Sequence, residues 1–126
     1  MPCLNLFTNV RVDAALAFAI IKEAIKAVTM VLGKPESYIM IVVNGLVPTT
    51  FGGIEEPAAY GELVSIRGLN LEANAKMSAA IADILQSKLS INKSWYYIKI
   101  YDVKNDYFGF NGSLVPLELV QGSKVI

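Results

Sequence analysis

The sequence predicts a single two-layer α+β domain, in which two helices cover one face of a four-stranded mixed sheet. The order strand–helix–strand occurs from residue 2 and again from residue 59, an offset of 57 residues, so the chain reads as a tandem βαβ repeat. Two right-handed βαβ units of this kind place both helices on the same face of one sheet. The chain has 126 residues, of which 54% are apolar, and this is enough for one buried core. We therefore expect residues 1–126 to form one domain.

The first unit contains a short apolar strand over residues 3–8 and a helix over residues 14–32. Asp13 is placed to cap this helix, along which apolar residues recur with helical spacing. Gly33 supplies the stop. Residues 38–43 are nearly all apolar or β-branched, which favours a strand that is covered on both faces.

The second unit follows a loop over residues 47–57 and begins with a strand over residues 59–67. Asn70 is placed to cap a helix over residues 71–89. The last strand covers residues 95–101. Its side chains alternate between two faces, and one of these faces should pack against the helices. The opposite face of this strand would carry Trp95, Tyr97, Lys99 and Tyr101.

The second face of the sheet has no helix to cover it in this arrangement. Its apolar residues need a partner, and closed symmetric oligomers are a common solution. The sequence therefore predicts an obligate oligomer.

The composition excludes several classes of protein. Eleven basic residues balance eleven acidic ones, so nothing favours a nucleic acid or a membrane as partner. There is no histidine, and the single cysteine, Cys3, excludes an intrachain disulfide, a CxxC redox pair and a multi-cysteine zinc site. We expect no cofactor and no metal. The first residues lack a secretory leader, which predicts a cytoplasmic protein, with unconventional export to the outside as the alternative.

Pro2 is the first candidate for chemistry. Removal of Met1 would free its secondary amine, and apolar surroundings disfavour the charged form of an amine. A neutral amine at pH 7 can act as a general base or as an imine-forming nucleophile. The start Met1-Pro2 alone, however, favours an N-terminal residue without a special role.

Two lysines are candidate anion-binding groups. Lys34 lies in the crossover that enters the second strand, where its position alone favours a solvated loop lysine over a carboxylate-binding group. Lys99 shares the open face of the last strand with Tyr97, and an ammonium group buried on that face needs an anion or a water-filled cavity. The pattern makes Lys99 the more informative of the two.

Several short motifs occur together in one order over residues 2–113. They are Met1-Pro2-Cys3, Gly33-Lys34-Pro35, Phe51-Gly52-Gly53, Glu56-Pro57-Ala58, Val64-Ser65-Ile66, Tyr101-Asp102 and Asn111-Gly112-Ser113. In this order and spacing the chain resembles the macrophage migration inhibitory factor (MIF) family. The resemblance is closest to its plant-type group, which is similar to both the cytokine and D-dopachrome tautomerase.

The resemblance implies a homotrimer, in which three sheets wrap a central channel, and an isomerase that needs no cofactor. The reaction would be keto–enol tautomerisation of phenylpyruvate- or dopachrome-like substrates, with a small aromatic keto acid as the typical substrate. Pro2 would accept and donate the proton. Lys34 and the Ile66 backbone would bind substrate oxygen atoms. Tyr97 would come from the neighbouring subunit, and Phe108 would lie at the pocket rim.

Four departures from the family pattern qualify this expectation. Lys99 stands where the animal cytokine has Asn, although plant-type relatives carry Lys. A second ammonium group near Pro2 would lower the pKa of its amine, but it would also narrow the pocket and displace the substrate carboxylate. We expect the displacement to have the larger effect, and so predict weak activity on phenylpyruvate. Residues 58–61 lack the cytokine's CxxC cysteines, Phe110 replaces a Trp, and residues 113–126 form a C-terminal extension.

Three functions remain open at this point. The first is a trimeric tautomerase of weak or altered activity, which the joint presence of Pro2, Lys34 and Tyr97 favours. The second is a MIF-like signalling protein that binds a cytokine-type receptor or another partner with little catalysis, which Lys99 favours. The third is a trimeric fold whose pocket has no function.

Overall fold

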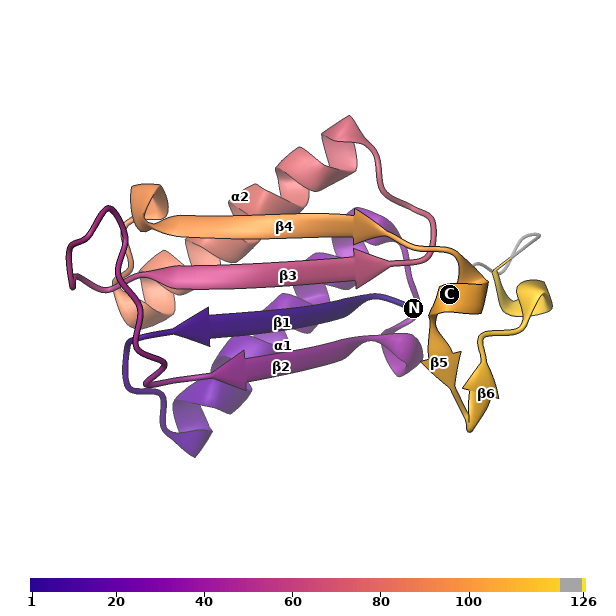
Figure 1. Ribbon diagram of the computed structural model, residues 1–126, viewed down its shortest axis with the longest axis horizontal. Coiled ribbons are helices and arrows are strands. Elements are labelled where there is room, and N and C mark those ends of the chain that lie inside the picture. Colours follow the sequence, from indigo (N-terminus) through magenta and orange to yellow (C-terminus); the bar gives the residue numbers. More distant parts are fainter. Residues whose placement is uncertain (121–125) are drawn as a thin grey trace.

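The computed structural model describes residues 1–120 and 126, and it has the two-layer architecture that the sequence predicts (Figure 1). Its main sheet contains β1 (Cys3–Thr8), β2 (Met40–Asn44), β3 (Ala59–Ser65) and β4 (Tyr96–Asp102), in the spatial order β2-β1-β3-β4. β1 pairs in parallel with β2 and β3 pairs in parallel with β4, whereas β1 and β3 are antiparallel. Each parallel pair is one βαβ unit, and the central antiparallel pair joins the two units into a mixed sheet.

The two helices lie side by side behind the sheet, as Figure 1 shows. They are α1 (Ala14–Leu32) and α2 (Leu71–Leu89), and their bounds agree with the prediction. The side chains of Asp13 and Asn70 each accept a hydrogen bond of 2.8 Å from a backbone amide in the first turn of the following helix. Gly33 ends α1 with a φ of 64°, a left-handed conformation that glycine adopts without steric cost.

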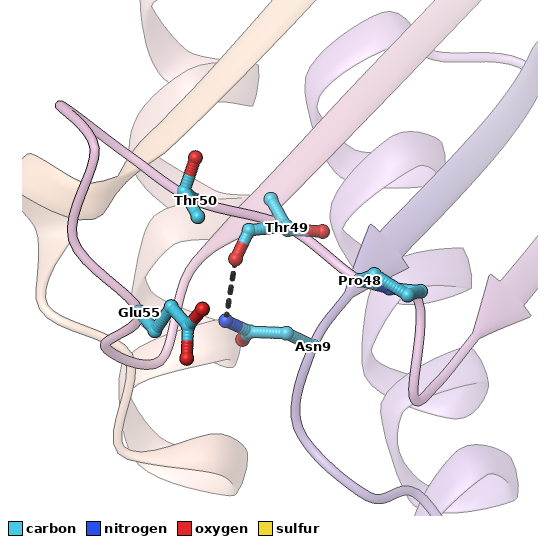
Figure 2. Close-up of a pocket in the computed structure, with 5 residues that line it drawn as sticks. All are labelled: Asn9, Pro48, Thr49, Thr50 and Glu55. Atoms are coloured by element: carbon cyan, nitrogen blue, oxygen red, sulfur yellow. Dashed lines mark hydrogen bonds between the residues drawn. The ribbon is translucent and has the colours of Figure 1, made fainter.

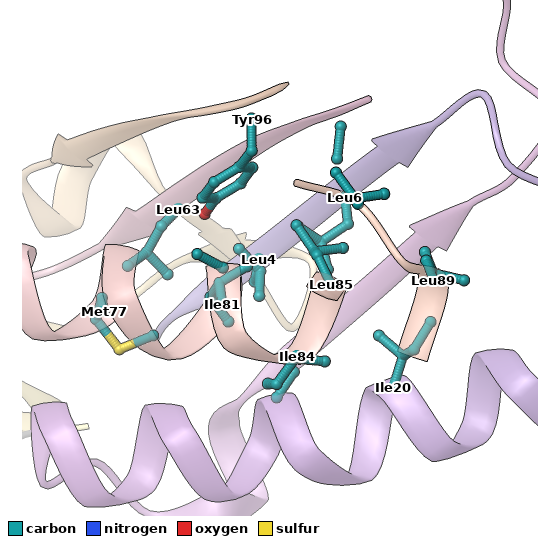
Figure 3. Close-up of a cluster of buried hydrophobic side chains, with 14 of the residues drawn as sticks. Leu4, Leu6, Ile20, Leu63, Met77, Ile81, Ile84, Leu85, Leu89 and Tyr96 are labelled. Atoms are coloured by element: carbon teal, nitrogen blue, oxygen red, sulfur yellow. The ribbon is translucent and has the colours of Figure 1, made fainter. Parts of the chain in front are cut away.

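The main core lies between the sheet and the helices (Figure 3). Leu4 of β1 and Leu63 of β3 point toward α2, where they pack with Met77 and Ile81, and all four side chains are fully buried. Burial of a side chain of this size contributes roughly 1.5–3 kcal/mol. This packing decides which face of each strand meets the helices and which stays open.

The alternation predicted for the last strand is confirmed. Tyr96 is buried against the helices, whereas Tyr97, Lys99 and Tyr101 are exposed on the open face of the sheet in the single chain. Trp95 lies just before the strand, in the short 3₁₀ helix η2 (Lys93–Trp95).

The prediction for the second strand is wrong in one respect. β2 begins at Met40, after the 3₁₀ helix η1 (Glu36–Tyr38), and it is an edge strand that is not covered on both faces. Ile41 and Val43 pack against the core, but Met40 and Val42 are 61% and 36% exposed. The apolar residues of β2 therefore alternate between the face of the sheet that the helices cover and the face that the single chain leaves open.

The chain after β4 stays at the end of the sheet at which β1 begins (Figure 1). This region contains η3 (Asn105–Tyr107), the hairpin of β5 (Gly109–Phe110) and β6 (Ser113–Leu114), and η4 (Leu117–Leu119). It brings the two ends of the described chain close together. Among the described residues, no helix has the length and hydrophobicity to cross a membrane.

Candidate functional site

The N-terminus lies at the end of the sheet where β1 starts and where β3 and β4 finish (Figure 1). Pro2 is less than 2% exposed and Met1 is 3% exposed. The carbonyl of Pro2 accepts a hydrogen bond of 3.1 Å from the amide of Met40. This bond extends the pairing of β1 with β2 to the start of the chain and holds the first residues inside the protein.

A cavity of about 350 Å³ lies beside these two residues. Its walls come from the chain that enters β2 and from the start of the β5–β6 hairpin, and they include Tyr38, Met40, Phe108 and Phe110. The rings of Tyr38 and Phe110 meet edge to face, with their centres 6.0 Å apart. The volume and the aromatic walls suit a small aromatic ligand.

Lys34 is the buried cation of this region, with 4% of its surface exposed. Its Nζ donates hydrogen bonds to the carbonyls of Ile66, at 2.9 Å, and Ile126, at 3.2 Å. The prediction of a solvated loop lysine is therefore wrong. The cover over Lys34 comes from residues 32 and 92 positions away, which the local sequence around Lys34 does not reveal.

The turn after β3 shapes the space around this lysine. Gly68 has a φ of 83°, and a Cβ atom there would lie 3.0 Å from Cε of Lys34. Burial, and next the positive charge of Arg67, lower the pKa of Lys34, while Asp102 acts in the opposite direction. Arg67 itself has a φ of 63°, and its amide donates a hydrogen bond of 3.3 Å to Asp102.

The amine at the start of the chain is perturbed in the same way. In the structure this amine belongs to Met1, and burial followed by the charge of Lys34 lowers its pKa from 8.0 to about 5. An amine in this position is neutral at pH 7, which is the form that accepts a proton. The adjacent thiol of Cys3 has its pKa raised by burial, so it stays protonated and is a poor nucleophile.

The structure brings four of the predicted site residues to one end of the sheet. Pro2 and Phe108 line the cavity, and Ile66 and Lys34 form a hydrogen bond next to it. The carbonyl of Ile66 is occupied by Lys34, so its amide N–H is the backbone group that could donate to a ligand oxygen. Tyr38 and Met40, which the sequence analysis did not single out, complete the cavity wall from η1 and β2.

Tyr97 and Lys99 do not lie at this site within one chain. The strand register places Tyr97 beside Tyr60, which pairs with Phe7 at the far end of β1 from Pro2. Lys99 is exposed, with its Nζ 6.0 Å from the ring centre of Tyr60. In the single chain no described element covers that face, so the prediction that Lys99 is the more informative lysine, which depends on burial by an oligomer, stays a prediction.

A second cavity, of about 440 Å³, lies at the opposite end of the sheet (Figure 2). Its lining includes Asn9, Thr49 and Glu55, and Nδ2 of Asn9 donates a hydrogen bond of 3.2 Å to the carbonyl of Thr49. The same amide group also bonds the backbone of Glu56 and Ala58. Asn9 thus holds the loop before β3 in place at this cavity. Among the described residues, no group of three or more His, Cys, Asp or Glu side chains is placed to hold a metal ion.

Comparison with known proteins assigns the sequence and the fold to one family. The sequence profile described as "Macrophage migration inhibitory factor (MIF)" matches residues 1–116. The chain belongs to the MIF family. Membership supports a tautomerase or cytokine-like function in general terms.

Individual relatives agree with this assignment over most of their length. The chain is 35% identical to a MIF homologue of Trichuris trichiura over 113 residues, which is 90% of this chain and 98% of the relative. A crystal structure of a MIF homologue from Prochlorococcus marinus superimposes with a TM-score of 0.86 at 31% identity, covering 90% of this chain and 99% of that one. The structure of MIF from Trichinella spiralis gives 0.80 at 33% identity, with 89% and 98% covered. None of these relatives tests the narrower plant-type assignment, which stays a prediction.

Proposed function

We propose that this MIF-family chain is a cofactor-free keto–enol tautomerase that uses the amine of Pro2, freed by removal of Met1, as its base. One observation carries the proposal: the N-terminus is buried beside Lys34 at an aromatic cavity, where the pKa of an amine falls well below its ordinary value. The best-matched substrates are phenylpyruvate- or dopachrome-like acids, since they combine an aromatic ring with a carboxylate. The ring suits the cavity wall, and the carboxylate suits Lys34.

The reaction is a proton transfer between carbon and oxygen. The neutral Pro2 amine takes the proton from the carbon next to the keto group, the C–H bond breaks, and a carbon–carbon double bond forms as charge moves to the oxygen. The resulting Pro2 ammonium then returns the proton to that oxygen and gives the enol. Lys34 and the Ile66 amide stabilise the negative charge that develops on the substrate oxygen atoms.

The complete site requires an assembly. The open face of the sheet exposes Tyr97, Lys99 and Tyr101, and the general tendency of this family to form oligomers supports a homotrimer that covers this face. Tyr97 and Lys99 would then reach the Pro2 cavity of a neighbouring copy. Lys99 in that position would hold the substrate carboxylate in an altered register, so that activity toward phenylpyruvate is weak.

A phenylpyruvate tautomerase assay tests the base, after intact mass has verified loss of Met1. Pro2→Gly keeps an N-terminal amine but replaces the ring-held secondary amine with a flexible primary one, so kcat/KM should fall by about 100-fold, the cost of a misplacement of about 1 Å. Pro48→Gly is the matched control, because Pro48 is an exposed loop proline at the other cavity (Figure 2). Activity that survives Pro2→Gly would exclude this mechanism.

The same assay tests the role of Lys99. Lys99→Asn should raise kcat/KM for phenylpyruvate, by up to about 100-fold, because a misplacement of about 1 Å can cost that factor. Lys104→Asn, a change of another exposed lysine, should leave it unaltered. An unchanged or lower rate in Lys99→Asn would contradict the idea that Lys99 limits activity.

The second candidate is a signalling protein that acts by binding a receptor or another partner. Lys99 favours it, because this lysine stands where the animal cytokine has a neutral Asn and is exposed on the open face of the sheet in the single chain. It would act outside the cell after unconventional export, whereas the enzyme is expected in the cytoplasm. Lack of turnover by mass-verified wild-type protein, together with saturable binding of the labelled protein to cell surfaces, would favour this candidate.

A further inference from the structure

A second apolar cluster, separate from the main core, surrounds the N-terminus. Met1 and Ile66 are buried there by Val115, Val120 and Ile126, and all five side chains are at most 6% exposed. Three of the five belong to the last part of the chain, described as residues 115–120 and 126, which we call the tail segment. The tail segment therefore supplies most of the cover over the start of the chain.

Backbone hydrogen bonds fix the tail segment in this position. The amide of Val115 donates to the carbonyl of Phe108 at 2.9 Å, and the side chain of Asn105 donates to the carbonyl of Val115 at 3.1 Å. The amide of Ile126 donates to the carbonyl of Leu119 at 3.2 Å. The segment is thus attached both to the hairpin that lines the cavity and to its own 3₁₀ helix η4.

The end of the tail segment also contacts the buried cation. Nζ of Lys34 donates to the main-chain oxygen of Ile126, which thereby occupies one of the three N–H donors that an anionic ligand would use. The bond from Lys34 to Ile66 belongs to the turn after β3 and need not change when a ligand enters. The bond to Ile126 has to break if a substrate carboxylate is to replace it.

The cover lies beyond the part of the chain that matches the family. The family profile ends at residue 116, so both Val120 and Ile126 are outside it. Of the three tail residues that cover the N-terminus, Val115 thus lies within the family match, whereas Val120 and Ile126 are an addition to it. Their burial costs the chain conformational entropy, which apolar contacts have to offset; after removal of Met1 these are the contacts with Ile66, Val115 and Phe108.

From these contacts we infer that the tail segment is an autoinhibitory cover, whose Ile126 carbonyl occupies the carboxylate position on Lys34 until substrate displaces it. The inference rests on the proposed function only for the identity of the displacing ligand. Because substrate binds only to the open form, its apparent Kd equals the Kd of the open form divided by the fraction of molecules that are open. Loosening the cover should increase both access to Lys34 and the apparent affinity for phenylpyruvate.

The test is amine labelling of the full-length protein with N-hydroxysuccinimide acetate, followed by peptide mass mapping. The loosened variant is Val120→Ser combined with Ile126→Ser, and the matched control is Leu117→Ser, since Leu117 is 48% exposed in the same segment. We expect Lys34 to react about 10-fold faster in the loosened variant than in wild type or control, as for a site about nine-tenths closed. Lys22, exposed on α1, is the internal standard and should react equally in all three.

The kinetic result should follow the labelling. KM for phenylpyruvate should fall by a similar factor in the loosened variant and stay constant in Leu117→Ser. Faster labelling without turnover in any variant would support the cover and contradict the proposed function. Equal labelling of Lys34 in wild type, control and loosened variant would overturn the cover, whatever the turnover. If the double variant fails to give a native circular dichroism spectrum, the milder Ile126→Ser alone applies the same test.

Discussion

A buried amine beside an ammonium group releases its proton more easily, because both the loss of water and the like charge disfavour its charged form. Burial is the larger cause at the N-terminus, and Lys34 adds to it. If the Pro2 amine is the base, kcat/KM must decline as pH falls through the pKa of that amine in the free enzyme. We expect this acid limb well below pH 8.0, the ordinary value for an N-terminal amine.

The contribution of Lys34 can be measured from the same pH profile. Lys34→Gln removes the positive charge, so the acid limb of the pH profile should move to higher pH. The substitution should also lower kcat/KM. Lys22→Gln removes an exposed charge of α1 and should move neither. A limb that stays in place in Lys34→Gln would show that Lys34 does not influence the base.

Gly68 is the residue on which the placement of Lys34 most directly depends. Gly68→Ala should displace Lys34, because the new Cβ would lie 3.0 Å from Cε, and it should therefore raise KM for phenylpyruvate. It should also lower the free energy of unfolding by about 1–2 kcal/mol, the cost of a left-handed backbone for a residue with a Cβ.

A matched control separates these two effects. Gly53→Ala has a similar backbone penalty, with a φ of 77°, but its Cβ would meet no atom within 4 Å. It should lower the stability in urea unfolding without changing KM. An equal change of KM in both variants would mean that strain in the backbone, and not contact with Lys34, affects binding.

At the level of secondary-structure elements, the features predicted correctly are those that depend on residues nearby in the sequence. Three of the four helix ends follow from Asp13, Gly33 and Asn70, because capping depends on residues within one turn of the helix end. Whether the two faces of β2 are buried does not follow from its own residues. Its position at the sheet edge depends on the order of all four strands, so an apolar run was misread as a strand buried on both faces.

The cap at Asp13 gives an element-scale prediction. Asp13→Ala should lower the free energy of unfolding by about 1 kcal/mol, because the first turn of α1 loses the acceptor for the Leu16 amide. Asp13→Asn keeps an acceptor oxygen and should be nearly neutral in urea unfolding. Since Lys34 follows the far end of α1, kcat/KM of the folded enzyme should stay constant in both. An equal loss in Asp13→Asn would assign the effect to the charge near the helix N-terminus.

At the scale of the whole molecule, the candidate site joins parts that are distant in sequence. Ordered motifs identify Pro2 and Lys34 as site residues, but the burial of Lys34 depends on Ile66 and Ile126, which lie 32 and 92 positions away. Tyr97 was expected from a neighbouring subunit, and the register places it far from the Pro2 cavity of its own chain. A single chain therefore contains only part of the proposed site.

Mixed assemblies test whether neighbouring chains complete each other's sites. Pro2→Gly subunits have a flexible primary amine in place of the proline amine, and Tyr97→Ala subunits lack the group that would reach a neighbour's cavity. Each homogeneous assembly should therefore have reduced activity. When the two are unfolded and refolded together, some sites combine Pro2 of one chain with Tyr97 of another. The activity of the mixture should therefore exceed the sum of the separate preparations.

The control is the same pair of variants mixed without unfolding, so that subunits do not exchange. If each site were built within one chain, no refolded combination could unite Pro2 with Tyr97, and the activity of the mixture would equal the average of the two parents. Sedimentation of the refolded sample verifies that both preparations assemble to the same size. Because both variants keep the buried core of Figure 3, a gain on refolding reports shared sites and not recovered folding.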